Sequence, residues 1–356
     1  MKKLEGYMAG VNLGGWLAQY LEGNLQRDPE HHFDRFITKE DIDRIADFGF
    51  DHVRVPFDYP LIEDDDKPFV YKESGFAYLD NCVNWCRAAG LNLVLDLHRA
   101  PGFSFNEPDK IVLFGDADMQ ARFLAIWQAF AKRYGGEGQN VVFELLNEIV
   151  EPDSTRWNKL ATRAIAAIRE IDQEHYILIG GIDYNNVWRL KDMPIFDDPK
   201  IIYNFHMYEP FALTHQHAAW TVAKDYPHSF VYPDDIAPYK EFVDFITKNG
   251  GRAAYDLQKK LNEGRERMDA GYVRAFLQPA KDFVLEHDLP LYCGEYGVID
   301  FADCESRANW TRDVANFCLE YGIGRALWSY KGMNFTMLNK DGKALHEGLI
   351  QAAALH

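Results

Sequence analysis

The chain has 356 residues and a mass of 41.1 kDa, and its 38 Lys and Arg against 55 Asp and Glu give a net charge of −17. A hydrophobic fraction of 47% and a charged fraction of 26% are typical of a globular protein and exclude a disordered chain, a fibre or a bundle of membrane spans. The negative charge argues against nucleic acid or an anionic membrane as a partner, because both would be repelled. Aromatic residues make up 14%, and some of these rings are candidates for facing a ligand.

Eight short β-branched or apolar runs alternate with amphipathic helical stretches. The predicted strands are 8–13, 52–56, 91–97, 141–147, 176–180, 201–206, 290–295 and 324–330. The predicted helices are 39–48, 77–89, 118–133, 155–170, 272–287 and 306–320. This alternation predicts an α/β fold with a parallel sheet, and eight such units close into a (β/α)8 TIM barrel. A doubly wound open sheet is the alternative, but no GxGxxG turn follows the first strand.

The segment after the sixth predicted strand breaks the pattern. Residues from about 209 to 264 show no clear strand–helix unit and are rich in Pro, Tyr, His and Lys. This length is too great for an ordinary loop of a compact domain. We therefore expect a single catalytic (β/α)8 domain over residues 1–356, with a small inserted subdomain or lid over about 209–264.

The N-terminus and the cysteines suggest no processing or disulfide framework. The first ten residues lack the apolar core of a secretory signal, so we expect an extracellular location if a leader was removed and a cytoplasmic one otherwise. Five sparse cysteines are neither a disulfide framework nor a zinc site, and Cys293 is expected to pack within a strand.

Polar residues at the ends of the predicted strands are the candidate functional residues, because the active site of such a barrel lies at these ends. They are Asn12, Arg54, His98, Asn147, Glu148, His206, Tyr208, Glu295 and Trp328. Taken singly, a Glu, His or Trp at such a position is more often structural. Arg54 differs, because a charge inside an apolar strand costs several kcal/mol unless it is paired. We therefore expect a carboxylate beside Arg54.

Two carboxyl groups at one barrel mouth, with an Arg, two His and a Trp, fit glycoside hydrolysis. One carboxyl must stay protonated to protonate the leaving oxygen, and the other must stay ionised to attack the anomeric carbon. We expect Arg54 to hold down the pKa of one carboxylate and make it the nucleophile. The less well paired carboxyl would have a raised pKa and act as the acid/base.

The motifs that carry these residues resemble glycoside hydrolase family 5, the cellulase family. VVFELLNE ends at Glu148, YNFHMY spans 203–208 and YCGEYG spans 292–297. GVNLGGW (10–16), HVRVP (52–56), LDLH (95–98) and ALW (326–328) agree in order and spacing, so the resemblance covers nearly the whole chain. It is nearest to the clostridial-type single-domain endoglucanases, with VEPDSTRWN at 150–158 and THQ at 214–216. One departure is Ile149, where the family commonly has Pro after the acid.

The resemblance implies roles for individual residues. Glu148 would be the acid/base and Glu295 the nucleophile, held by Arg54 and by a hydrogen bond from Tyr208. Asn147 would bind the sugar 2-hydroxyl, His98 and His206 would line the subsite before the cleaved bond, and Trp328 would be its floor. Weaker substrate-binding candidates are Asn12, Trp16 and Trp220.

The resulting hypothesis is a retaining endo-β-1,4-glucanase, expected to be a monomer, that acts on soluble cellulose derivatives and mixed-linkage β-glucan. It implies a neutral polysaccharide as the partner, and no metal or cofactor. A β-mannanase or glucomannanase and a β-1,3-glucanase remain alternatives on the same scaffold. A non-catalytic sugar-binding barrel would require loss of a catalytic carboxylate, and both are present. A phosphate-handling barrel enzyme is disfavoured, because no Gly-rich phosphate site follows the last two strands.

Overall fold

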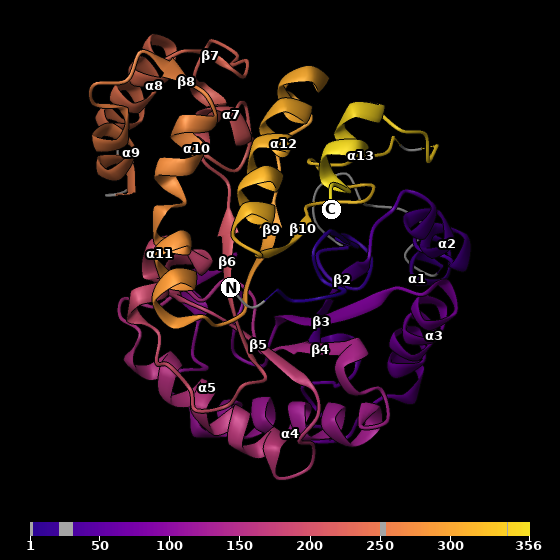
Figure 1. Ribbon diagram of the computed structural model, residues 1–356. Coiled ribbons are helices and arrows are strands. Elements are labelled where there is room, and N and C mark those ends of the chain that lie inside the picture. Colours follow the sequence, from indigo (N-terminus) through magenta and orange to yellow (C-terminus); the bar gives the residue numbers. More distant parts are fainter. Residues whose placement is uncertain (1–2, 21–30, 250–253, 340) are drawn as a thin grey trace.

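Eight parallel strands form a closed barrel in the computed structural model, which describes residues 3–20, 31–249, 254–339 and 341–356 (Figure 1). The strand order around the barrel is β1-β10-β9-β6-β5-β4-β3-β2. Their bounds are β1 Gly10–Asn12, β2 His52–Asp58, β3 Asn92–Arg99, β4 Val141–Glu144, β5 Tyr176–Gly180, β6 Ile201–Met207, β9 Leu291–Tyr296 and β10 Gly324–Leu327. The predicted (β/α)8 barrel and all eight of its predicted strands are confirmed.

Helices surround this barrel on the outside (Figure 1). The longer ones are α2 Lys39–Asp47, α3 Glu73–Ala89, α4 Ala117–Tyr134, α5 Thr155–Arg169, α10 Ala270–Phe276, α11 Gln278–His287, α12 Cys304–Glu320 and α13 Glu347–Ala353. Three helices of four residues lie in connections: α1 His32–Arg35, α6 Ile182–Asn185 and α7 Phe211–Thr214. The prediction of one helix over 272–287 was wrong, because Pro279 lies in the first turn of α11, the helical position where a missing N–H is tolerated.

The segment between β6 and β9 contains more regular structure than its sequence pattern predicted. Beyond α7 it holds an antiparallel pair, β7 Asp234–Asp235 and β8 Arg267–Met268, and the helices α8 Ala237–Lys248 and α9 Ala254–Asn262. These elements lie together beyond one end of the barrel (Figure 1). The buried residues of α8 follow helical spacing: Tyr239, Phe242, Val243 and Ile246. Residues 250–253 of the predicted insertion lie outside the described residues.

The inward side chains of β3 change from apolar to ionisable along the strand. On β3, Val94 is followed at every second position by Asp96 and His98, and all three are buried. Val94 belongs to an apolar cluster that fills one end of the barrel, with Leu4, Tyr7, Val142, Leu178, Ile202, Tyr292 and Ala326. The polar layer follows this cluster toward the carboxyl ends of the strands, where the site lies. Within the described residues no helix combines the length and apolarity needed to cross a bilayer.

Candidate active site

Arg54 lies at the centre of a buried ionic network. Its guanidinium forms a two-point ion pair with Glu144 through Nε (2.6 Å) and Nη2 (2.9 Å). Nη1 donates to Glu295 Oε1 at 2.8 Å, and Nη2 lies 3.0 Å from Asp96 Oδ2. Arg54, Asp96 and Glu144 are fully buried. The predicted carboxylate partner of Arg54 is confirmed, and the structure supplies three.

Glu148 and Glu295 come together at this network with His206 between them. One carboxylate oxygen of each glutamate and a ring nitrogen of His206 all lie within 4.8 Å of one another. His206 Nδ1 is 2.9 Å from Glu148 Oε1 and 3.7 Å from Glu295 Oε2. Tyr208 donates its hydroxyl hydrogen to Glu295 Oε2 at 2.9 Å. The two carboxyls therefore have different partners. Glu295 is bound by the guanidinium of Arg54 and the hydroxyl of Tyr208, whereas Glu148 contacts the imidazole of His206.

Burial dominates the pKa values of both glutamates. It raises the pKa of Glu148 to about 7, while the interactions with His98 and Arg54 act to lower it. Burial also raises the pKa of Glu295, although His206 and Arg54 act to lower it. The expectation that Arg54 would bring this pKa below its ordinary value was wrong, because burial outweighs the effect of a guanidinium that also pairs with two other carboxylates. Burial also lowers the pKa of His206 to about 4, so its contact with Glu148 is a hydrogen bond of a neutral imidazole.

Two buried polar atoms beside the glutamates have no hydrogen-bond partner among the described residues. Asn147 accepts from Arg54 Nη2 at 2.9 Å through Oδ1, which leaves its Nδ2 unpaired. His98 Nδ1 lies 2.7 Å from Asp96 Oδ2, and His98 Nε2 is unpaired. Buried polar groups are nearly always satisfied in native proteins, so these two atoms are candidates for contacts with a polar ligand.

Aromatic rings border the same place. Trp328 stacks in parallel with His98 at a centroid distance of 5.8 Å and is 5% exposed. The Tyr208 and Phe335 rings meet at 5.6 Å, and both contact the ring of His215. Trp220, 57% exposed, lies 6.4 Å from His215 at the outer end of this row. The exposure of Trp220 is compatible with a substrate contact.

Two predicted substrate contacts are corrected by the structure. Trp16 is fully buried, donates Nε1–H to the Phe33 carbonyl and stacks on Trp85, so its ring faces the protein. Asn12 is also fully buried: Nδ2 donates to the Gly294, Ala326 and Leu327 carbonyls, and Oδ1 accepts from Arg54. Neither presents a free group to a ligand, and Asn12 instead supports Arg54.

Sequence reasoning missed Asp96 and Glu144, which lie as close to Arg54 as Glu295 does. The signal was present, since both are acidic residues within predicted apolar strands. The rule that a buried charge needs a partner was applied to Arg54 alone. Applied to all three residues, it would have predicted the network.

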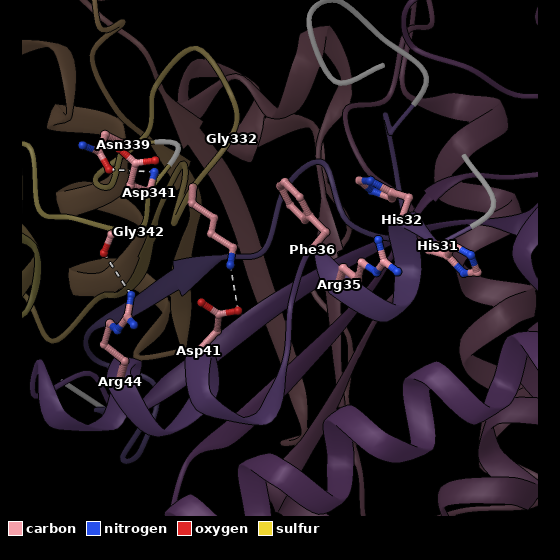
Figure 2. Close-up of a pocket in the computed structure, with 11 residues that line it drawn as sticks. His31, His32, Arg35, Phe36, Asp41, Arg44, Gly332, Asn339, Asp341 and Gly342 are labelled. Atoms are coloured by element: carbon pink, nitrogen blue, oxygen red, sulfur yellow. Dashed lines mark hydrogen bonds and ion pairs between the residues drawn. The ribbon is translucent and has the colours of Figure 1, made fainter. Parts of the chain in front are cut away.

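A cavity of about 360 Å³ lies apart from the catalytic centre, between the connections that follow β1 and β10 (Figure 2). Lys331 pairs with Asp41 there at 2.7 Å, and Arg44 donates to the Gly342 carbonyl. The residues that line it are His31, His32, Arg35, Phe36, Asp41, Arg44, Lys331, Gly332, Asn339, Asp341 and Gly342. None of the predicted catalytic residues lines this cavity.

The spacing of Glu148, His206 and Glu295 is also compatible with a divalent cation, since imidazole and carboxylate are both metal ligands. Without a cation, the two carboxyls of this group can instead act as an acid/base and a nucleophile. That chemistry needs no metal.

Comparisons with known proteins show the family and the fold of the chain. Residues 18–334 match the cellulase family, glycosyl hydrolase family 5. Endoglucanase C of Acetivibrio thermocellus is 46% identical, with 98% of each chain covered. Cellodextrinase A of Ruminococcus flavefaciens is 35% identical over 91% of this chain and 86% of the relative. A hyperthermophilic endo-β-1,4-glucanase solved with its substrate superposes with a TM-score of 0.74 at 22% identity, covering 98% of this chain and 97% of that one, which shows the shared fold.

Proposed function

Because the chain belongs to glycosyl hydrolase family 5, we propose that it is a retaining endo-β-1,4-glucanase that acts on soluble cellulose derivatives and mixed-linkage β-glucan. The 46% identity to an endoglucanase over 98% of both chains supports the glucanase activity. The observation that supports the mechanism is the close approach of Glu148 and Glu295, because one carboxylate oxygen of each lies within 4.8 Å of the other, which favours the shorter of the two separations known for such pairs. Retaining enzymes separate the two carboxyls by about 5–5.5 Å and inverting enzymes by about 6.5–9.5 Å.

In the first step, Glu148 donates its proton to the glycosidic oxygen while Glu295 attacks the anomeric carbon. The bond from that carbon to the leaving oxygen breaks, and a glycosyl ester on Glu295 forms. In the second step, Glu148 takes a proton from water, whose oxygen attacks the anomeric carbon and releases Glu295. The stereochemistry at the anomeric carbon is inverted twice and therefore retained.

The surroundings of each carboxyl suit its proposed role. Glu295 receives hydrogen bonds from Arg54 and Tyr208, which stabilise its charged form. Glu148 has a pKa raised to about 7 by burial, so it carries its proton under mildly acidic conditions. In this proposal the contacts with Arg54 and Tyr208 favour the ionised form of Glu295, against the effect of burial, while Glu148 holds the proton.

The unpaired polar atoms and the aromatic rings would hold the sugar. We assign Asn147 Nδ2 to the 2-hydroxyl, where contacts tighten in the transition state, and His98 and His206 to the same subsite. Trp328 would form its floor, and Trp220 would contact a sugar further out. Pyranose rings present apolar C–H faces, so a neutral glucan can bind to aromatic rings on a chain of net charge −17.

Substitution of the proposed nucleophile tests the assignment. Glu295→Ala should lower kcat on barley β-glucan by on the order of 10⁴-fold or more with folding intact, as loss of a nucleophile does. Azide should restore turnover of an aryl cellobioside and give a product of inverted configuration. Glu174→Ala, at an exposed glutamate paired with Lys200, is the matched control and should keep full activity. Normal activity of Glu295→Ala would end the assignment.

Substitution of the proposed acid separates the two roles. Glu148→Gln should lose most activity on substrates with poor leaving groups, because these need the proton most. Rates on a series of aryl cellobiosides of increasing leaving-group pKa measure this, and an equal loss across the series would contradict the role.

Family membership alone does not decide the sugar. Initial rates on carboxymethyl-cellulose, barley glucan, laminarin and mannan would separate the β-1,4-glucanase from the β-1,3-glucanase and mannanase alternatives. We expect the first two substrates to be turned over fastest.

A further inference from the structure

Asp96 and His98 form a buried pair whose chemistry is set by Arg54. Both residues lie on β3, two positions apart, so they face the same side of the strand. Asp96 is fully buried and His98 is 1% exposed. A single oxygen, Asp96 Oδ2, lies 2.7 Å from His98 Nδ1 and 3.0 Å from Arg54 Nη2.

The position of Arg54 decides which of these atoms carries a proton. A guanidinium only donates, and its positive charge 3.0 Å away favours an unprotonated oxygen at Oδ2. Two unprotonated atoms would repel at 2.7 Å, so His98 Nδ1 must carry the hydrogen of this contact. The argument applies to the ionised form of Asp96, which is the form that the charge of Arg54 favours.

The second ring nitrogen is then an acceptor. Burial lowers the pKa of His98, which favours the neutral ring with a single N–H. With that hydrogen on Nδ1, Nε2 presents a lone pair, and it is buried without a partner among the described residues. The ring of His98 lies parallel to the ring of Trp328. It is also close enough to Glu295 and Glu148 for their charges to act on its pKa, and His98 therefore borders the proposed sugar site.

We propose that Asp96 is a positioning residue that holds His98 as its Nδ1–H tautomer, so that Nε2 selects a sugar hydroxyl that donates a hydrogen bond. This inference rests on the proposed function, since it takes the ligand beside Trp328 to be a sugar. A sugar that lacks the hydroxyl leaves a buried acceptor unpaired, which disfavours its binding. Asp96 thus contributes to substrate specificity without touching the substrate.

Two substitutions of Asp96 separate this role from a role as a counter-charge for Arg54. Asp96→Asn removes the charge but keeps an oxygen, and the positive charge of Arg54 favours this oxygen over the amide nitrogen at the position of Oδ2. Asp96→Leu has similar size and removes both the charge and the acceptor. We expect kcat/KM on p-nitrophenyl β-cellobioside, each enzyme at its own pH optimum, to fall less than about 5-fold in Asp96→Asn and about 10- to 100-fold in Asp96→Leu, the range for partners that orient a functional histidine. Equal losses in the two variants would overturn the proposal.

The tautomer can be read directly, which keeps the proposal testable even where Asp96→Leu folds poorly. Nitrogen-15 NMR of histidine-labelled protein, with His98→Gln to assign the signals, should show the proton on Nδ1 in the wild type and in Asp96→Asn. A proton on Nε2 in the wild type would refute the proposal, whatever the activities of the variants.

Deoxy substrates test the contact itself. With the 2-hydroxyl assigned to Asn147, we use the 3-deoxy and 6-deoxy analogues of p-nitrophenyl β-cellobioside, altered in the ring that carries the leaving group. One analogue should lower kcat/KM of the wild type about 10-fold or more and cause less than a 3-fold further loss in Asp96→Leu, because the two changes remove the same interaction. Losses that multiply for both analogues would contradict the proposal.

Failure here is distinguishable from failure of the proposed function. If only the role of Asp96 is wrong, Glu295→Ala is still inactive and rescued by azide. If the proposed function is wrong, Glu295→Ala stays active, while the NMR experiment still reports the tautomer of His98.

Discussion

Around Arg54, one positive charge is distributed over Asp96, Glu144 and Glu295, with Glu148 nearby. Burial raises the pKa of each of these carboxyls, to about 7 for Asp96 and Glu148. Because the charges do not balance, the site retains protons near neutral pH. The carboxyl with the fewest charged partners, Glu148, is the one suited to deliver a proton to a substrate.

The pKa of Glu148 predicts the alkaline limb of the pH profile. In its proposed role as the acid, Glu148 acts in the protonated form, so kcat/KM on p-nitrophenyl β-cellobioside should be high below pH 7 and fall as the pH rises through about 7. A 2,4-dinitrophenyl leaving group needs little protonation, so this limb should weaken with that substrate. Profiles from pH 4 to 9 with both substrates give the comparison, and identical alkaline limbs would argue against Glu148 as the acid.

At the scale of elements, the connection after β6 links the catalytic centre to the inserted segment. Glu209 directly follows Tyr208, and its Oε2 accepts from the Phe211 N–H at 2.6 Å and from Gln258 of α9 at 2.7 Å. The structure shows a carboxyl whose pKa is raised to about 8 by burial and which ties α9 to the barrel.

Breaking this tie should loosen the inserted segment. Gln258→Ala removes a partner of a buried carboxyl and should lower the free energy of unfolding by about 1–3 kcal/mol. Cleavage by thermolysin within residues 209–264 should accelerate. Glu241→Ala, at an exposed position of α8, is the control and should match the wild type. A cleavage rate unchanged in Gln258→Ala would show that this hydrogen bond does not hold the segment.

At the scale of the whole molecule, the net charge of −17 acts on any charged substrate. Carboxymethyl-cellulose is an anion and is repelled at low salt, whereas barley β-glucan is neutral. The range of this repulsion falls from about 30 Å at 0.01 M salt to about 10 Å at 0.1 M.

Salt should therefore raise activity on one substrate and leave the other unchanged. Between 0.01 M and 0.2 M NaCl, kcat/KM on carboxymethyl-cellulose should rise several-fold, while that on barley β-glucan stays constant. Initial rates at low substrate concentration measure both. An equal response of the two substrates would show that salt acts on the enzyme rather than on the encounter.

Local patterns in the sequence were sufficient to predict the barrel and the residues at its mouth. Strand and helix periodicity depends on neighbours a few residues apart, and the ends of parallel strands necessarily meet at one rim. Arg54, Glu148 and Glu295 were predicted on this basis, and the structure brings them together. The helix α8 also has apolar residues at helical spacing, but the frequent Pro, Tyr and His around it made this pattern difficult to recognise in the sequence.

Only the tertiary structure decided what surrounds each of these side chains. Trp16 and Trp220 are alike in sequence terms, yet one is fully buried and the other 57% exposed. Arg54 pairs with three carboxylates that come from three different strands. Burial outweighs the effect of Arg54 on the pKa of Glu295. Burial and the sharing of one charge depend on residues far apart in the chain, so the pattern around a single residue does not contain them. The sequence by itself determined the barrel and its pair of glutamates, and the packing decided their partners, their protons and which aromatic rings remain free for a sugar.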